Sequence, residues 1–402
     1  LFAEERKIRT PREDFRSCLL NAALQFYYRP DATHGYLLAG YPWFGVRARD
    51  LFIALPGCTI YADAPERFYR IMDTVLPDMR AFMRQEGISR EIRNINEGDI
   101  GLWAIWTLQE YARWSSLPDM VSRYGDFLDE LIHYYLRNVH PNLRIDDNGL
   151  CVMTGDGRPL SWMDAKVNGQ AVVRREGYLV EVNALWYNAL CFYREALPQK
   201  WTPELEELLG RVQQSFCDTF INQHGYLFDY VHPHSSWRDW SVRPNMVFAT
   251  SLPYSPLPKA TRRSVLEIIT RELRTPKGLR SLSPKSDGYQ PQCHGTQWQR
   301  EQSYYNGSVW PWLLGPYFEA CIKLYGRSAI SFIENTLIGM EEELQQHGVG
   351  TVSELFDGNP PFKGRGAISF AMSVGELLRS LALLEEAKSK YDTQILPIIR
   401  YE

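Results

Sequence analysis

Residues 65–85 read PERFYRIMDTVLPDMRAFMRQ, and apolar side chains return in this stretch every three or four positions. That spacing is the period of an α-helix with one buried face. The apolar positions of this face are Phe68, Ile71, Met72, Val75, Met79 and Phe82. The stretch therefore predicts a helix whose apolar side packs against other helices.

The same period recurs along the whole chain. The further stretches are 12–28, 99–113, 120–136, 181–195, 203–221, 259–274, 312–325, 330–345 and 368–387. Segments 50–62 and 243–251 are ambiguous between helix and loop. Thr10-Pro11 and Thr202-Pro203 each offer a capping hydroxyl followed by proline, which is typical of a helix start. Helices are thus expected to dominate, with short strand-like pieces such as Val152-Met153-Thr154 between them.

The domain organisation follows from what the chain lacks. No Gly/Ser/Pro-rich linker and no exact repeat divides it, so residues 1–402 are expected to form one large all-α domain of helical hairpins. The long segments 137–180, 223–257 and 275–310 are rich in Trp, His, Asp and Arg, and such loops more often carry function than merely connect. We expect them to gather at one end of the domain, and residues 388–402 to form a C-terminal tail.

Charge and cysteine content narrow the function classes. The chain has 44 Lys+Arg and 48 Asp+Glu, a net charge of −4, with no strong basic run, so nucleic acid is not expected as a partner. No apolar run approaches the ~20 residues of a membrane-spanning helix. The seven cysteines are scattered without a CxxC pair, which is typical of reduced thiols and favours a cytoplasmic location.

Common cofactor and metal motifs give no support for that chemistry. The chain has no GxxxxGK[ST], GxGxxG, HExxH or GxSxG motif. Asp146-Asp147-Asn148-Gly149 lacks the remaining ligands of a calcium loop, and His232-Pro233-His234 has no third ligand nearby in the sequence. We therefore expect neither a cofactor nor a metal site.

Aromatic residues are abundant, with 12 Trp, 23 Tyr and 18 Phe. A large core uses aromatic side chains because each one buries a large area. A sugar-binding cleft uses them because the faces of pyranose rings stack on flat side chains. The count alone fits both interpretations.

Carboxylates set among these aromatics are the remaining candidates for chemistry: Asp50, Asp164, Glu181 and Glu354. Hydrolysis of a glycosidic bond needs a protonated carboxyl group as acid and an ionised one as base or nucleophile. Burial beside an indole keeps a carboxyl group protonated, and Trp162 lies two residues before Asp164. The alternative is structural, because a carboxylate flanked by apolar residues is most often a helix cap or an ion-pair partner.

Several motifs, taken in order, resemble one family. They are Gly40-Tyr41-Pro42-Trp43-Phe44 with Arg49-Asp50, Trp162-Met163-Asp164-Ala165-Lys166, Glu181–Asn188, Arg243-Pro244-Asn245, and the segments 251–257, 278–284, 307–316 and 353–358. From about residue 36 to about residue 380 the sequence resembles the C-terminal catalytic domain of glycogen debranching enzymes, the amylo-α-1,6-glucosidase type. A single matching motif would be weak evidence for this family, but the whole series of motifs in the same order is specific for it.

The resemblance implies a fold and a reaction. The fold is an (α/α)6 toroid of six inner and six outer helices, as in six-hairpin glycosidases. The reaction removes α-1,6-linked glucose at a branch point of glycogen or another α-glucan, with inversion. Asp164 would be the general acid and Glu354 the general base, with their carboxyl groups ~6.5–9.5 Å apart to admit water. An upstream N-terminal domain of the same polypeptide is also expected.

The resemblance further implies substrate-binding residues. Asp50, with Arg49, would hold the hydroxyl groups of the terminal glucose. Trp43, Trp162, Trp186 and Trp310 are candidates for the aromatic walls, although a core position is an equally good interpretation for each. The other predicted substrate-binding residues are Lys166, Glu181, Asn183, Arg243, Asn245 and Asp357.

The chain departs from the family pattern at two places. Gly45-Val46-Arg47-Ala48 replaces the frequent Thr-Asp-Trp-Gly, so an acid and a Trp are missing and Arg47 is new. Tyr304-Tyr305-Asn306-Gly307-Ser308 replaces Tyr-His-Gln-Gly-Thr. These changes leave open another toroidal glycosidase or a phosphorylase acting on a different α-glucoside, although Glu354 argues against a phosphorylase. A non-catalytic glucan-binding domain is the alternative outside enzymes.

Overall fold

The structure, a computed structural model, describes residues 12–392, and most of them are helical. The α-helices are α2 (Phe15–Phe26), α3 (Ala48–Cys58), α4 (Pro65–Met83), α5 (Ile100–Trp114), α6 (Leu117–Leu136), α7 (Val180–Ala196), α8 (Pro203–Phe220), α9 (Phe248–Ser251), α10 (Lys259–Glu272), α11 (Gln297–Tyr304), α12 (Leu314–Tyr325), α13 (Ile330–Glu341) and α14 (Ala371–Asp392). No helix within residues 12–392 is long and apolar enough to span a bilayer.

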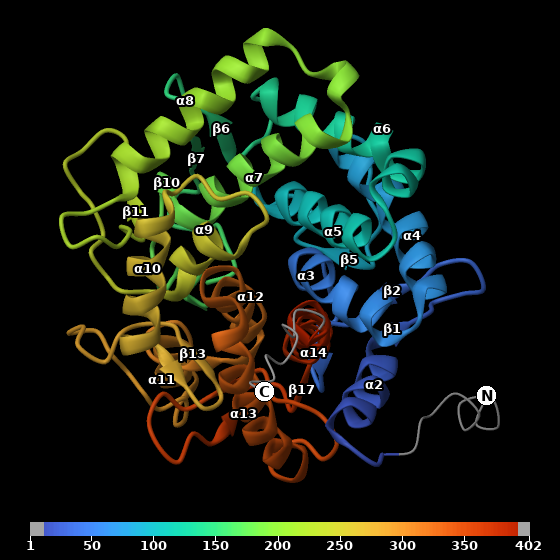
Figure 1. Cartoon of the computed structure of the whole chain (residues 1–402), viewed down its shortest axis with the longest axis vertical. Coiled ribbons are helices and arrows are strands. Elements are labelled where there is room, and N and C mark those ends of the chain that lie inside the picture. Colours follow the sequence, from blue (N-terminus) through green and yellow to red (C-terminus); the bar gives the residue numbers. More distant parts are fainter. Residues whose placement is uncertain (1–11, 393–402) are drawn as a thin grey trace, which may run out of the picture.

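The helices form two layers (Figure 1). In the inner layer α3, α5, α7, α9, α12 and α14 each contact the next, and α14 returns to α3. Around them lie α2, α4, α6, α8, α10 and α13. The largest side chains with almost no exposed surface, among them Trp103, Trp186 and Trp312, lie in the core that these layers enclose. The expectation of a mainly helical fold is confirmed.

The predicted helices agree closely with the observed ones. Both ambiguous segments hold helices, α3 and α9, and the Thr202 side chain caps α8 by accepting from the Leu205 N–H. Helix α2 begins at Phe15 with Asp14 as its cap, whereas Thr10-Pro11 lies outside the described residues. The tail predicted at 388–402 is wrong for its first part, because α14 continues to Asp392. Residues 393–402 lie outside the described residues.

The term all-α is too narrow, because the long loops pair as short strands. Buried backbone N–H and C=O groups need partners, and pairing within loops supplies them. The largest sheet is antiparallel, in the order β12 (Arg274–Thr275), β13 (Gly278–Arg280), β14 (Val309–Trp310), β15 (Leu355–Phe356) and β16 (Gly364–Arg365). It brings Trp310 beside the segment that begins with Glu354.

The remaining strands form two-stranded pairs. They are β1 (Tyr27–Tyr28) with β2 (Tyr36–Leu37), β3 (Gly40–Tyr41) with β17 (Ser369–Phe370), β4 (Val46–Arg47) with β5 (Ile92–Arg93), β6 (Leu143–Ile145) with β7 (Cys151–Met153), β8 (Lys166–Val167) with β9 (Gln170–Ala171), and β10 (Tyr178–Leu179) with β11 (Tyr230–Val231). The β4–β5 pair is parallel and the others are antiparallel. The β3–β17 pair joins the segment before α3 to the segment before α14.

Helices α3 and α14 meet backbone to backbone at Gly57 and Gly375. A Cβ atom added to Gly57 would lie 1.9 Å from the carbonyl oxygen of Gly375 and 2.5 Å from its Cα. Real Cβ atoms do not approach backbone atoms this closely. Helix α3 can therefore touch α14 here only because Gly57 has no side chain.

We expect Gly57→Ala to lower the free energy of unfolding by about 3 kcal/mol, because overpacking against backbone forces the two helices apart. Gly210→Ala is the matched control: Gly210 is exposed in α8, with no atom within 4 Å of an added Cβ. Alanine is the better helix former, so this control should gain up to about 1 kcal/mol. Thermal unfolding of both variants checks the pair. Equal melting temperatures for Gly57→Ala and wild type would contradict the close contact.

Candidate active site

A cavity of about 880 Å³ lies among four loop segments. Its walls come from the segment before α3, the loop around Asp164, the segment that includes α11, and residues 354–366. The lining residues are Trp43, Phe44, Arg47, Asn94, Asp164, Ala165, Lys166, Cys293, His294, Gly295, Gln297, Arg300, Glu301, Tyr304, His347, Glu354, Gly364, Arg365 and Gly366. Two of the three long predicted loops thus contribute directly, and segment 223–257 does not.

A second, very small space of about 10 Å³ shares Arg47, Asp164 and Glu354 with the cavity and forms its floor. This floor is completed by Arg49, Asp50, Trp162, Tyr305, Trp310, Phe370 and Met372. Asp50, Asp164 and Glu354 come from regions more than a hundred residues apart in the sequence, and the fold brings them to one place. The two predicted catalytic carboxylates therefore face the same cavity.

Asp164 has hydrogen-bond donors on both carboxyl oxygens. The hydroxyl group of Tyr305 donates to Oδ1 at 2.9 Å, and the guanidinium group of Arg47 donates to Oδ2. Only 17% of the Asp164 side chain and 20% of the Arg47 side chain are exposed to solvent. Asp164 is thus held from two sides at the junction of cavity and floor.

Asp50 and Arg49 lie in the floor with different partners. Oδ2 of Asp50 is 3.0 Å from Nε of Arg47, but it accepts no hydrogen bond in the described structure. Nε and Nη2 of Arg49 are engaged elsewhere, since they donate to Asp99 at 2.8 and 2.7 Å and Nη2 also donates to Glu97. Asp50 therefore keeps a buried acceptor that a sugar hydroxyl could use, whereas Arg49 anchors the N-terminal turn of α3.

Glu354 lies almost completely buried just before β15. Burial raises the pKa of this carboxyl group to about 7, although hydrogen bonds from Tyr304 and from the backbone of Ala367, together with the charge of Arg47, act in the opposite direction. The Ala367 N–H donates to Oε2 at 2.8 Å. A carboxyl group with this pKa can gain or lose a proton near neutral pH, which suits acid–base catalysis.

The four predicted wall tryptophans have three different environments. Trp43 lines the cavity and is 61% exposed. Trp162 and Trp310 lie in the floor against Tyr305, whose ring is parallel to Trp310 at a centroid distance of 5.1 Å and perpendicular to Trp162 at 5.3 Å. Trp186 does not line either space: it is buried in α7 and donates to the carbonyl of Gly149. Of the two interpretations that the sequence left open for Trp186, the structure shows the core position.

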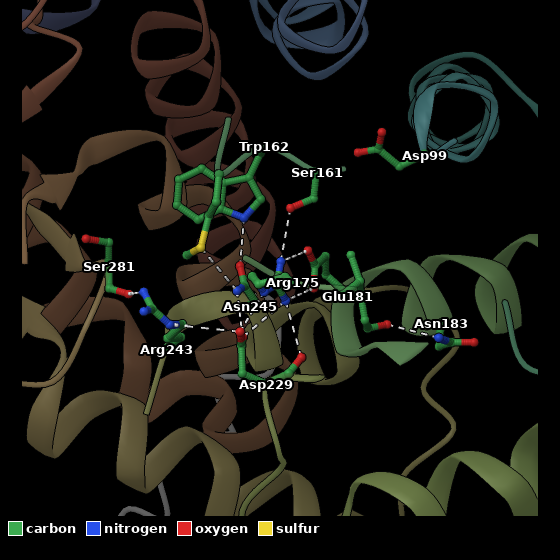
Figure 2. A network of polar contacts seen from close by, with 12 residues as sticks. Asp99, Ser161, Trp162, Arg175, Glu181, Asn183, Asp229, Arg243, Asn245 and Ser281 are labelled. Carbon is green, nitrogen blue, oxygen red and sulfur yellow. Dashed lines mark hydrogen bonds and ion pairs between the residues drawn. The ribbon is translucent and has the colours of Figure 1, made fainter. Parts of the chain in front are cut away.

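Four of the other predicted binding residues belong to a buried polar region behind the cavity (Figure 2). Arg175 is its centre: the guanidinium group pairs with Glu181 at 2.5 and 2.6 Å and with Asp229 at 2.6 Å. Asn245 donates to Asp229 at 2.7 Å and accepts from the indole N–H of Trp162, also at 2.7 Å. The region thus connects α7 to the residue pair that precedes Asp164.

Arg243 continues this support toward the opposite wall. It donates to the backbone carbonyl of Tyr305 at 2.6 Å and to Asn306 at 3.0 Å. Asn183 has a different role, since its amide pairs with both backbone groups of Cys151. Glu181, Asn183, Arg243 and Asn245 line neither the cavity nor its floor. In this structure they support the loops around it, and their contact with substrate stays a prediction.

The last two predicted binding residues lie at or near the cavity. Lys166 is exposed and lines it. Asp357 lies behind the wall, where it pairs with Arg365 at 2.8 Å and accepts from the backbone N–H of Cys293 at 2.9 Å. Because Cys293 and Arg365 both line the cavity, Asp357 fixes the wall rather than facing the substrate space.

Sequence reasoning did not single out one wall of the cavity. Helix α11 presents Gln297, Arg300, Glu301 and Tyr304 to it, at helical spacings of three, one and three. Arg47 was recognised only as a departure from the family pattern, and Arg175 and Asp229 were not recognised. No group of three or more His, Cys, Asp or Glu side chains in residues 12–392 is placed to hold a metal ion.

The amylo-alpha-1,6-glucosidase family matches residues 21–379 in sequence, nearly the whole chain. The chain belongs to this family. No curated protein is significantly similar to it in sequence. Its motifs and its cavity thus agree on a glycoside hydrolase family.

Solved structures show the same fold at low sequence identity. A GH63 mannosylglycerate hydrolase from Thermus thermophilus, in complex with Tris, is 13% identical with a TM-score of 0.62, covering 91% of this chain and 99% of that chain. A glycosidase variant in complex with glucose is 13% identical with a TM-score of 0.58, covering 95% and 98%. An uncharacterized conserved protein, also from Thermus thermophilus, is 16% identical with a TM-score of 0.63, covering 91% and 99%.

We expect Glu354→Gln to raise the melting temperature more at pH 8 than at pH 5. Between pH 4.5 and about 7 the carboxyl group ionises only in the unfolded chain, so rising pH favours unfolding of wild type through this window. The full effect amounts to about 3 kcal/mol, and below pH 4.5 it vanishes because both states are protonated. Thermal melts of both proteins at the two pH values check this. An equal difference at both would contradict the raised pKa.

Proposed function

We propose that the protein removes single α-1,6-linked glucose residues from branch points of glycogen or a similar α-glucan, by an inverting acid–base mechanism. The observation that carries the proposal is the convergence of Asp50, Asp164 and Glu354 on one cavity in a chain of the amylo-alpha-1,6-glucosidase family. The cavity opens beside an exposed indole, that of Trp43, on which a further sugar ring of the glucan can stack.

The mechanism assigns one step to each carboxyl group. Asp164 gives its proton to the glycosidic oxygen as the bond from C1 to that oxygen breaks, and the electron pair stays with the oxygen. Glu354, in its ionised form, takes a proton from a water molecule whose oxygen bonds to C1. Asp50 accepts hydrogen bonds from hydroxyl groups of the departing glucose. Exchange with solvent returns the proton from Glu354 to Asp164.

The helical frame of this site is proposed to be an (α/α)6 toroid. The contacts of α3, α5, α7, α9, α12 and α14 in a closed series, with six further helices outside, support this arrangement (Figure 1). Glycogen as the partner, an upstream N-terminal domain that helps to hold it, and a cytoplasmic location remain proposals that rest on the family and on the sequence.

We expect Asp164→Asn and Glu354→Gln to differ in how their activity depends on the leaving group. On a phosphorylase limit dextrin each variant should release glucose at least about 10³-fold more slowly, because each lacks one proton-transfer group. α-Glucosyl fluoride needs no proton on its leaving group, so Asp164→Asn should lose far less activity on it. Glu354→Gln should be slow on both substrates, because water still has to be activated.

Glucan binding separates this proposal from a non-catalytic domain. Glu354→Gln should bind limit dextrin as wild type does in affinity electrophoresis, and Asp164→Asn should bind it at least as tightly. If wild type, with the upstream domain restored, binds branched glucan but releases no glucose, the domain is a binding module. Full activity of Asp164→Asn on the dextrin would overturn the assignment of the acid.

The stereochemistry of the product tests the role of water. Direct attack of water on C1 opposite the leaving oxygen converts an α-linkage into β-glucose. Proton NMR within the first turnovers should therefore show the β-anomeric signal before mutarotation produces the α-anomer. An initial α-anomer would indicate a covalent intermediate and would contradict Glu354 as a base.

A further inference from the structure

Arg47 lies between the two carboxylates that the proposed reaction needs to be free. It ends β4, whose parallel pairing with β5 fixes the backbone, and its guanidinium group is 5.5 Å from the centre of the Phe44 ring. From this position it pairs with Asp164 through Nη2 and with Asp50 through Nε, at 3.0 Å in the second case. One cation therefore bridges the proposed acid and the proposed sugar ligand.

The contacts of Asp164 favour its ionised form. Both oxygens accept hydrogen bonds, one from Tyr305 and one from Arg47, and donors aimed at a carboxyl group stabilise the charged state. A general acid needs a proton on one of these oxygens and an open path to the glycosidic oxygen. As long as Arg47 occupies Oδ2, that oxygen can neither hold a proton nor face the substrate.

The surroundings of Glu354 differ from those of Asp164. The titratable and charged groups that line the cavity or its floor together with Asp164 are Arg47, Arg49, Asp50, Lys166, Cys293, His294, Arg300, Glu301, Tyr304, Tyr305, His347, Glu354 and Arg365. Of the two catalytic candidates only Glu354 lacks a cation in direct contact among the described residues, and burial raises its pKa to about 7. Below about pH 7 Glu354 therefore holds a proton, whereas its proposed role as base requires it to be ionised.

We infer that Arg47 is a positioning residue that holds Asp164 ionised in the empty site and leaves it when substrate binds. The inference rests on the proposed function, since it gives Asp164 the role of acid. Arg47 keeps a partner after leaving, because Nε already faces Asp50. Part of the free energy of substrate binding is thereby used to separate Arg47 from Asp164.

The test is steady-state kinetics of Arg47→Gln on limit dextrin. Without the ion pair to break, KM should fall by up to about tenfold while kcat changes little. Arg47→Lys keeps the charge and should retain the KM of wild type. Arg47→Met, which keeps an unbranched side chain over Phe44, is a second neutral variant and should behave as Arg47→Gln does.

The pH profile gives a readout that a purely structural role would not move. The plot of kcat/KM against pH is a bell limited by the two macroscopic pKa values of the carboxyl pair. Removing the cation makes Asp164 harder to ionise, so the acid limb should move to higher pH and the maximum should rise. Arg93→Gln is the matched control, because Arg93 lies opposite Arg47 on the paired strand β5, is exposed, lines neither the cavity nor its floor, and forms no salt bridge among the described residues.

The outcomes separate this inference from the proposed function. An unchanged KM and acid limb in both neutral variants, or an equal shift in Arg47→Lys or Arg93→Gln, would overturn the role of Arg47. If Asp164→Asn is inactive in the same assay, the proposed acid survives that result. If Asp164→Asn is fully active, the proposed function itself fails.

Discussion

The contact between α3 and α14 is the constraint on which the rest of the structure depends. It joins the first inner helix of the chain to the last, and it is possible only because Gly57 meets the backbone of Gly375 without a side chain between them. Helix α3 begins with the residues around Arg49 and Asp50, and α14 begins beside Phe370 and Met372. The same contact that closes the inner layer therefore sets the two sides of the cavity floor.

The buried ion pairs of Arg175 provide a second constraint, which acts on the loops. Taking charged groups out of water is costly unless each is paired, and separating a buried pair is strongly destabilising. Arg175 forms ion pairs with Glu181 and Asp229, which belong to different segments. Asn245 donates to Asp229 and accepts from the indole N–H of Trp162, and so links these pairs to the loop of Asp164 (Figure 2). The loop that carries Asp164 is thus fixed from behind, away from the substrate space.

The sequence predicted the helices well because most of them bury one face, which leaves the period of 3.6 residues visible. Helix α11 lacks that signal: its sequence QWQREQSY is polar, since one face lines a cavity and the rest is largely exposed. The start of α11 could still have been predicted from the sequence. Thr296 and Gln299 are three residues apart, which is the spacing of a capping box, and they form one in the structure. The short strands were missed for a similar reason, since two or three residues carry no period.

Residues that occur in family motifs could be singled out from the sequence, whereas residues whose contacts depend on distant partners could not. Asp50, Asp164 and Glu354 meet at one cavity as expected, although their roles are still proposals. Arg175 and Asp229 are 54 residues apart, and in sequence a charged residue far from any motif resembles a solvated one. A family motif alone also does not give the environment of a residue. Trp186 and Trp43 both lie in motifs, but Trp186 is buried and Trp43 is 61% exposed.

The small volume of the floor limits how a substrate can lie in the site. Past Arg47, Asp164 and Glu354 the floor leaves only about 10 Å³, enough for one water molecule or a single hydroxyl group. For the proposed glucan substrate, the floor has no room for a second sugar beyond the carboxyl pair, which agrees with the proposed removal of a terminal glucose residue.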